Sequence, residues 1–594
     1  MSVRVLHGIP ICPGVAFGQA HPVDRRRVTV PRFRLPPEQR NAERARFERA
    51  IRDSEAQLEA LRSRSEEELG FGPVSNLLRA HAMILRDGAF FDAAADRIEE
   101  EGQNAEWAVR STIREVKRLF DHVDHPYFRE RRSDVDVVGD RVLRNLLGIE
   151  SDPLANLPPG AVIAAYDLTP ADTLALGRSA VAAFVTEGGG RTSHTAILAR
   201  ALGVPCVLGL SGLLDAVQAE QAIIVDGGSG TVVIEPSDGE VSRYQGIAQR
   251  RAKEEASLLA DRDLPAQTVD GHRVRLFGNI EVRQEVEVLR RVGAEGVGLY
   301  RTEFLHIDEV DLEDPDAHGA AYGSVLAQME GRPVTVRTLD LGGDKRGAPS
   351  LAMDWEPEAD HGASPMGLRG IRISLRELPG FRVQLQGILQ ASARGPVRIL
   401  LPFVTDLVEL REAKGALERA RRDLAAKGAD FDPDVAVGVM IETPASVFCL
   451  EHLQEECDFF SVGTNDLVSL VMAADRNDEA TSHIHRPAHP AVLRVLRTIR
   501  ERTSVPVCIC GELAADPFMT PVLVGLGYDE LSMAAASIPV VKRLVRRLDA
   551  GACRELVDDI WNLRTADEVE ARIAERLRAW VPDLFGGAQP AETP

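Results

Sequence analysis

The sequence predicts a multidomain α/β protein: an α/β domain with an inserted helical bundle, a helical linker and a C-terminal (β/α)8 barrel of the TIM type. Three observations predict it. The 594 residues exceed what one hydrophobic core normally organises. A Glu- and Arg-rich stretch with apolar residues at helical spacing interrupts the N-terminal half. After residue 270, apolar segments of strand length alternate with helical patterns.

The composition narrows the class of protein. Hydrophobic residues make up 44% and charged residues 27%, as in soluble globular proteins. Apolar runs stay well short of a membrane span, and the N-terminus lacks a signal-peptide layout, so we expect no membrane insertion. Seven cysteines without paired spacing favour reduced thiols in the cytoplasm. A net charge of −21 disfavours nucleic acid as a partner.

The N-terminal half divides by its periodicity. Short strands are expected in residues 1–34, helices in 35–147, and strands again in 148–240, from AVIAAY to AIIVDGGSGTVVIEP. Residues 1–34 and 148–240 are therefore predicted to form one α/β domain, and 35–147 a helical insert. A purely structural insert is the alternative to a binding module. A charged helix in 241–265 is predicted to be a semi-rigid linker.

Residues 266–580 are predicted to form the barrel, and 581–594 a disordered tail. The eight expected strands lie in VRLFGNI, GVGLYRTEF, VTVRTLD, RILLPFV, AVGVMIETP, FFSVGTND, VPVCICGE and YDELSM. Polar residues follow many of these runs, where the C-terminal strand ends of such a barrel meet. They are Arg301, Arg337, Glu442, Asn465, Asp466 and Cys510.

The segment EGGGRTSHTAILAR is the first candidate chemical centre. Its glycines allow a tight turn after a strand, and Thr192 or Ser193 can cap a helix that begins near Thr195. His194 would then lie at a helix N-terminus, where free N–H groups and Arg191 could stabilise a phosphoryl group on the imidazole. A Gly-rich turn with a capping histidine is the alternative.

The barrel mouth is the second candidate centre. Arg301, Arg337, Lys345, Arg369, Arg372 and Arg476 supply the positive charge that an anion with a carboxylate and a phosphate would need. Glu442 and Asp466 supply oxygen ligands for Mg²⁺. Such a site suits phosphoryl transfer, which needs positioning and charge neutralisation.

Two cysteines and three histidines raise further possibilities. Cys508 and Cys510 share one face of a strand, and Cys510, nearer its end, is predicted to face the site and donate a proton to carbon. Cys508 is expected to pack in the core. Zinc binding by His483, His485 and His489 is a weak alternative, because no Cys/His pair with zinc-site spacing accompanies them.

The strings GGRTSHTAILAR, GLYRTEFL, RTLDLGGDK, GVMIETP, FFSVGTNDL and CGELAAD resemble Enzyme I of the bacterial phosphotransferase system. The resemblance covers nearly the whole chain. It implies that phosphoenolpyruvate phosphorylates His194 with release of pyruvate, and that His194 passes the phosphate to a histidine of the carrier HPr, the first step of sugar phosphotransfer. HPr would bind the helical insert, and the cytoplasmic protein would dimerise through its barrel.

The resemblance also implies residue roles. Arg301, Arg337, Asn465 and Arg476 would contact phosphoenolpyruvate, Glu442 and Asp466 would hold Mg²⁺, Cys510 would donate the proton and Thr173 would orient the histidine. Since His194 and the barrel belong to different domains, the His194 domain must move. The sequence departs from the family at Val468, Ser469, Leu470 and Asn477, and at His485–Ala488.

These departures leave a nitrogen-type or otherwise specialised paralogue open. A dikinase is less favoured, because the chain has no Gly-rich nucleotide loop. A scaffold that only senses phosphoenolpyruvate would need neither metal ligands nor a proton donor.

Overall fold

The computed structural model confirms the predicted fold class. It describes residues 4–23, 30–69, 81–82, 84–86, 88–121, 126–148, 157–168, 181–189, 195–196, 199, 203–305, 313–340, 367–475 and 481–585. Two compact units share these residues. The described residues up to 254 form the first unit, and those from 255 onward form the second.

An eight-stranded mixed sheet organises the α/β part of the first unit. Its order is β1-β8-β7-β3-β4-β5-β6-β2. The two edge strands follow each other in sequence and are separated only by Gly8, so the sheet curves until its edges approach. Successive residues of a strand point to opposite faces, so Val162 and Ile163 belong to separate hydrophobic clusters. The strands are β1 (Arg4–His7), β2 (Ile9–Cys12), β3 (Val15–Val23), β4 (Ala161–Ala165), β5 (Val181–Thr186), β6 (Cys206–Leu208), β7 (Ala222–Asp226) and β8 (Thr231–Ile234).

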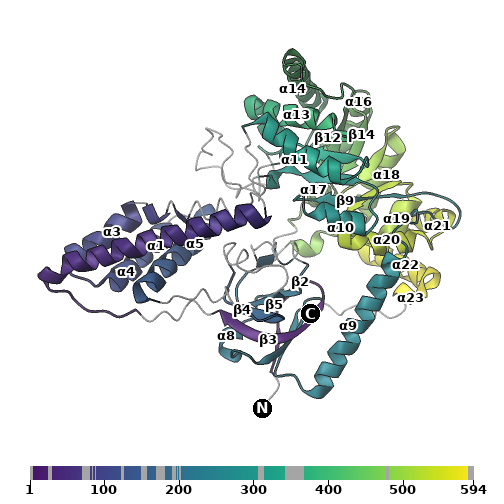
Figure 1. Ribbon diagram of the computed structural model, residues 1–594. Helices are drawn as coiled ribbons and strands as arrows, with labels where there is room; N and C mark the ends of the chain where they lie inside the picture. Colours follow the sequence, from purple (N-terminus) through teal and green to yellow (C-terminus); the bar gives the residue numbers. More distant parts are fainter. Residues whose placement is uncertain are drawn as a thin grey trace. The chain divides into compact units, whose positions relative to one another are not determined.

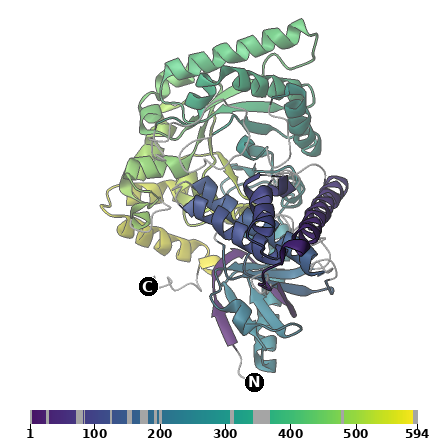
Figure 2. The ribbon, with the colours of Figure 1, turned by 90° about the vertical axis from the view of Figure 1, so that its left-hand side faces the viewer.

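Helices occupy the stretch for which helical spacing was expected. Figure 1 shows α1 beside α3, α4 and α5, and Figure 2 shows them turned by 90°. Phe47 and Phe91 stack at 5.5 Å between ring centroids within this bundle. The helices are α1 (Pro37–Leu69), α3 (Gly88–Glu99), α4 (Ala105–Asp121) and α5 (Pro126–Leu147).

The charged helix α9 (Asp238–Leu259) continues from the first unit into the second. Tyr244 is buried against Ile224 and Val233 of the sheet, so the first half of the helix is part of that domain's core. Beyond its end, the carbonyl of Arg262 accepts a hydrogen bond from Lys542 Nζ at 2.5 Å in the barrel unit. Apolar residues at helical spacing thus anchor one end, and polar bonds hold the other. The short helix α8 (Leu213–Ala216) precedes β7.

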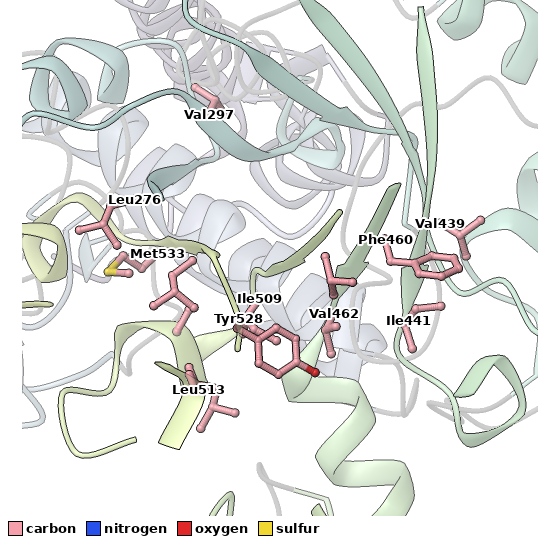
Figure 3. Packing of buried hydrophobic residues seen from close by; sticks show 14 of the residues in the cluster. Leu276, Val297, Val439, Ile441, Phe460, Val462, Ile509, Leu513, Tyr528 and Met533 are labelled. Carbon is pink, nitrogen blue, oxygen red and sulfur yellow. The ribbon is translucent and has the colours of Figure 1, made fainter. Parts of the chain in front are cut away.

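Eight parallel strands close the barrel in the order β9 to β16, each where an apolar run predicted it. Ile441, Val462 and Ile509, from three neighbouring strands, belong to the main hydrophobic cluster (Figure 3). The strands are β9 (Arg275–Ile280), β10 (Val297–Arg301), β11 (Val334–Arg337), β12 (Val397–Leu401), β13 (Ala436–Ile441), β14 (Phe459–Val462), β15 (Val507–Ile509) and β16 (Glu530–Met533).

Helices cover the barrel and follow its last strand. They are α10 (Glu285–Arg291), α11 (Pro315–Gln328), α12 (Ile371–Arg376), α13 (Leu378–Ser392), α14 (Leu407–Ala426), α15 (Pro444–Phe448), α16 (Leu450–Gln454), α17 (Thr464–Met472), α18 (Pro490–Arg502), α19 (Thr520–Gly525), α20 (Ile538–Val545), α21 (Ala550–Ile560), α22 (Ala566–Trp580) and α23 (Pro582–Phe585). Among the described residues, no helix combines the length and apolar character that a membrane crossing requires.

Candidate active site

The predicted site residues divide into two groups. His194, Thr173, Lys345 and Arg476 lie outside the described residues, as do Arg191, Thr192, Ser193 and Asn477. The structure describes the surroundings of the remaining candidates, which are Arg301, Arg337, Arg369, Glu442, Asn465, Asp466 and Cys510.

Thr195, Ala196 and Ala199, which follow His194 in the sequence, are helical. Ala196 and Ala199 are buried in the cluster that contains Ile163 and Phe184. The buried hydroxyl of Thr195 donates a hydrogen bond to Asp167 Oδ1 at 3.0 Å. The position next to His194 is therefore anchored to the loop that follows β4, at the C-terminal edge of parallel strands.

Two arginines end neighbouring barrel strands, and each is held by carboxylates. Arg301 at the end of β10 donates to Glu281 Oε1 at 2.6 Å. Arg337 at the end of β11 pairs with Glu303 and, at 3.0 Å, with Asp340. Burial opposes the charge of Arg337, but the two carboxylates outweigh burial and raise its pKa above the ordinary value. This guanidinium is therefore a fixed positive charge.

Arg369 comes from the segment before α12 and joins the same charge network. Its Nη2 contacts Asp340 Oδ2 at 3.2 Å and Asp466 Oδ2 at 3.1 Å. Its guanidinium carbon lies 4.5 Å from the ring centroid of Phe403. Asp340 is fully buried, so one carboxylate between β11 and α12 fixes two arginines of the site.

Glu442 follows β13 directly and is 1% exposed. Its Oε1 accepts a hydrogen bond from the backbone N–H of Phe403 at 2.7 Å, whereas its buried Oε2 has no hydrogen-bond partner in the part of the chain that the structure describes. Burial, and then the nearby charges of Asp466 and Asp340, raise the pKa of Glu442 to about 8. A carboxylate with a free oxygen beside like charges is poised to accept a cation.

This donor set fits a hard divalent cation. Glu442 and the 35% exposed side chain of Asp466 offer carboxylate oxygens, and Mg²⁺ in proteins often uses one or two carboxylates with substrate oxygens and water. The described residues contain no group of three or more His, Cys, Asp or Glu side chains arranged for a metal ion. If these two carboxylates held the cation, substrate oxygens and water would complete its coordination.

Asn465 lies in the first turn of α17, shortly after β14, and Cys510 directly follows β15. The Asn465 side chain accepts a hydrogen bond from the backbone N–H of Glu512 at 2.9 Å and donates to its carboxylate at 3.3 Å. Cys510 is buried among Leu299, Leu400, Met440 and Phe459. Burial raises the pKa of the Cys510 thiol to about 11. The charge of Glu442 raises this pKa further, whereas the charges of Arg337 and Arg301 lower it. The thiol thus keeps its proton at neutral pH.

The three histidines considered for zinc include two with structural contacts. His489 Nδ1 accepts a hydrogen bond from the N–H of Ala491 at 3.1 Å and caps α18. His485 Nε2 lies 3.4 Å from the carbonyl oxygen of Asn465. These contacts favour supporting roles for both rings over zinc binding.

Sequence reasoning did not single out several residues that define the site. They are Glu281, Glu303, Asp340, Phe403 and Glu512. Glu303 and Asp340 stand in the strings GLYRTEFL and RTLDLGGDK, next to residues that were singled out. Their signal was a carboxylate two or three residues from an arginine at a strand end. No comparable signal marked Phe403.

Comparison with known proteins finds relatives along nearly the whole chain. Residues 7–131, 157–230 and 255–550 match three families, described in turn as "PEP-utilising enzyme, N-terminal", "PEP-utilising enzyme, mobile domain" and "PEP-utilising enzyme, PEP-binding domain". Proteins named phosphoenolpyruvate-protein phosphotransferase are similar over nearly the full length. That of Cupriavidus necator is 38% identical and covers 96% of this chain and 99% of its own.

The Bacillus subtilis protein of the same name is 35% identical, over 97% of this chain and 100% of its own. A solution structure described as Enzyme I (nEIt) is 32% identical, over 42% of this chain and 99% of that one, with a TM-score of 0.37. Both of these full-length relatives carry the name of a phosphotransferase.

Proposed function

The chain belongs to the phosphoenolpyruvate-protein phosphotransferase family, and from that membership we propose that it transfers the phosphoryl group of phosphoenolpyruvate to His194 and then to a carrier protein. The observation that carries the proposal is the barrel mouth. Alternate strands bring three groups to this mouth: Arg337 at the end of β11, Glu442 after β13 and the protonated thiol of Cys510 after β15. One oxygen of Glu442 has no hydrogen-bond partner among the described residues. The substrate carries each complementary group: a carboxylate, a phosphate and an enol carbon.

The arginines perform the binding. Arg301 and Arg337 project from adjacent strands, and Arg369 reaches in from the segment before α12. Guanidinium groups held by Glu281, Glu303 and Asp340 are oriented before substrate arrives, so less conformational entropy is lost on binding. Lys345 and Arg476 are proposed to add positive charge, and Asn465 a hydrogen bond.

Glu442 and Asp466 are proposed to hold Mg²⁺, which when bound would neutralise phosphate charge. The free Oε2 of Glu442 supports this assignment. The Phe403 N–H occupies Oε1, so Oε2 is the oxygen available to the cation. Because the Glu442 pKa is about 8, this carboxyl would release a proton on binding a cation near neutral pH.

The proposed chemical step breaks the bond between phosphorus and the enol oxygen and forms a bond between phosphorus and a His194 ring nitrogen. The enolate left behind takes the Cys510 thiol proton at its terminal carbon and becomes pyruvate. Solvent then returns a proton to the thiolate. A thiol pKa of about 11 suits this role, because the thiol stays protonated until a strong carbon base appears.

The second transfer is proposed to go from His194 to a histidine of HPr or a related carrier, with the helices of 35–147 as the docking element. Thr173 is proposed to orient the His194 ring. A homodimer through the barrel and a cytoplasmic location complete the proposal, and seven free cysteines are consistent with a reducing compartment.

Labelling with phosphoenolpyruvate tests the function. The full chain, incubated with Mg²⁺ and substrate carrying labelled phosphate, should gain acid-labile, base-stable label and release pyruvate. His194→Ala should stay unlabelled while binding substrate normally, because the barrel is intact. Addition of purified HPr should discharge the label from wild type. Stable labelling of His194→Ala would refute the assignment of the phosphorylated residue.

A further inference from the structure

Phe403 adopts a backbone conformation that bulky residues seldom take. It lies two residues beyond β12, has φ of 56° and is 3% exposed. The left-handed region costs a residue with a side chain roughly 1–2 kcal/mol, and such strain persists only where the surroundings enforce it. A buried phenylalanine with this backbone conformation therefore calls for a structural reason.

The surroundings of Phe403 supply that reason. Its N–H holds Glu442 Oε1 at 2.7 Å, and its ring lies under the guanidinium of Arg369 at 4.5 Å. With this ring beneath it, the edge of the Arg369 guanidinium reaches Asp340 and Asp466. One residue thus contacts both a proposed metal carboxylate and a proposed substrate arginine.

The segment at the start of α12 packs against Phe403 and restrains its ring. Gly370, at φ of 55°, has no side chain where a Cβ would come within 2.8 Å of the Phe403 Cβ. The N–H of Ile371 donates to the carbonyl of Pro402 at 3.2 Å. Arg372, which lies 5.4 Å from the same ring, also pairs with Glu409 at 3.1 Å. Contacts on both sides fix the distance between ring and guanidinium.

We propose that the ring of Phe403 is a positioning element that holds Arg369 in the orientation needed for an anionic substrate; the inference rests on the proposed function of the barrel mouth. The aromatic face attracts the guanidinium, and its flat surface confines the plane of the group. Arg369 then presents its N–H groups to the site without the loss of freedom that a flexible arginine would suffer.

Two replacements separate this role from simple packing. Phe403→Leu keeps an apolar side chain but removes the aromatic face. Pentafluorophenylalanine at position 403 keeps the ring shape but reverses the charge of its face. Each should raise the Kd for phosphoenolpyruvate in Mg²⁺ about three- to thirtyfold, the range expected for a cation–π contact.

Matched changes at Phe381 provide the control. This phenylalanine is equally buried, at 3% exposure, but belongs to α13 and the main barrel core. Phe381→Leu and pentafluorophenylalanine at 381 should shift the melting temperature to a similar extent and leave the Kd unchanged. If the 403 variants bind as tightly as wild type, or if the 381 variants weaken binding equally, the positioning role is wrong. Absence of binding to wild type would instead overturn the proposed function.

Discussion

Arg369 and Asp466 hold each other through two hydrogen bonds, from Nη2 to Oδ2 at 3.1 Å and from Nη1 to Oδ1 at 3.3 Å. The pair joins a proposed substrate arginine to a proposed metal ligand. Asp340 binds the same guanidinium from the buried side, so Arg369 is shared by two carboxylates. The parallel geometry uses both terminal nitrogens, which an ammonium group cannot reproduce.

Arg369→Lys should therefore weaken phosphoenolpyruvate binding while preserving the charge. Loss of one charge-assisted hydrogen bond, worth about 1.5–3 kcal/mol, corresponds to roughly a tenfold or greater increase in Kd. Calorimetric titration with substrate in Mg²⁺ measures it. Arg411→Lys is the control, because Arg411 pairs with Glu456 on the exposed surface of α14. An unchanged Kd for Arg369→Lys would exclude a geometric requirement for the guanidinium.

Glu442→Gln should separate stability from function. The Glu442 pKa of about 8 means that the carboxyl is largely protonated at pH 7 without a cation, and glutamine keeps an oxygen for the Phe403 N–H. The free energy of unfolding in EDTA should change by less than about 1 kcal/mol. Phosphorylation of His194 should fall on the order of a hundredfold or more, because the amide is a weak Mg²⁺ ligand.

Scanning calorimetry and a Mg²⁺ titration of labelling measure the two effects. Glu418→Gln, at an exposed position of α14, should change neither quantity. A Glu442→Gln protein that labels at the wild-type rate would contradict the metal assignment. A large loss of stability in EDTA would show that this carboxylate is structural.

The barrel could be predicted from the sequence because its determinants are local. Each strand is a short apolar run, and parallel strands bring their C-terminal residues to one mouth, so Arg301, Arg337 and Glu442 could be expected there. The character of α9 was predictable only in part. Its charges predicted a linker, whereas Val241, Tyr244 and Ile247 form an apolar stripe that packs on the first domain.

The partners within the site could not be predicted, because they depend on how loops from different strands approach each other. Asp340 reads as a loop residue after β11, and its contact with Arg369 forms only when the segment before α12 folds back. Phe403 is harder still. Left-handed backbone is expected at glycine or asparagine, and tertiary contacts override that preference here.

Cys510 should resist alkylation until the solution is strongly basic. Burial raises its pKa to about 11, compared with about 8.5 for an unperturbed thiol. The folded thiol is therefore neutral between pH 7 and 9, and its reaction with iodoacetamide should rise only above this range. Because the unfolded thiol ionises first, this residue's contribution to stability is lost as pH increases beyond about 8.5.

Peptide mapping by mass spectrometry should find Cys449, which is only half-buried, modified before Cys510. Rapid labelling of Cys510 at pH 7 would contradict a protonated donor.

Helix α9 offers a test of whether transfer requires the helix to bend. Gly246 lies within it, and a Cβ at this position would meet no atom within 4 Å. Gly246→Ala should thus stiffen the helix by roughly 0.5–1 kcal/mol without a steric clash. His194 belongs to the unit on one side of α9 and the barrel to the other, so phosphoryl transfer requires the two to meet. If bending near Gly246 permits that meeting, labelling of His194 at saturating phosphoenolpyruvate should slow several-fold while the Kd stays constant.

Rapid-quench labelling and calorimetry measure the two quantities separately. Gly415→Ala is the matched control, because this glycine also lies on a helix, α14, where an added Cβ would come no closer than 3.8 Å to a neighbouring atom. The control should gain similar helix stability and label at the wild-type rate, since α14 lies wholly within the barrel unit. Equal labelling rates in wild type, Gly246→Ala and Gly415→Ala would mean that the required motion does not occur in the middle of α9. A raised Kd in Gly246→Ala alone would mean that the helix influences the substrate site directly.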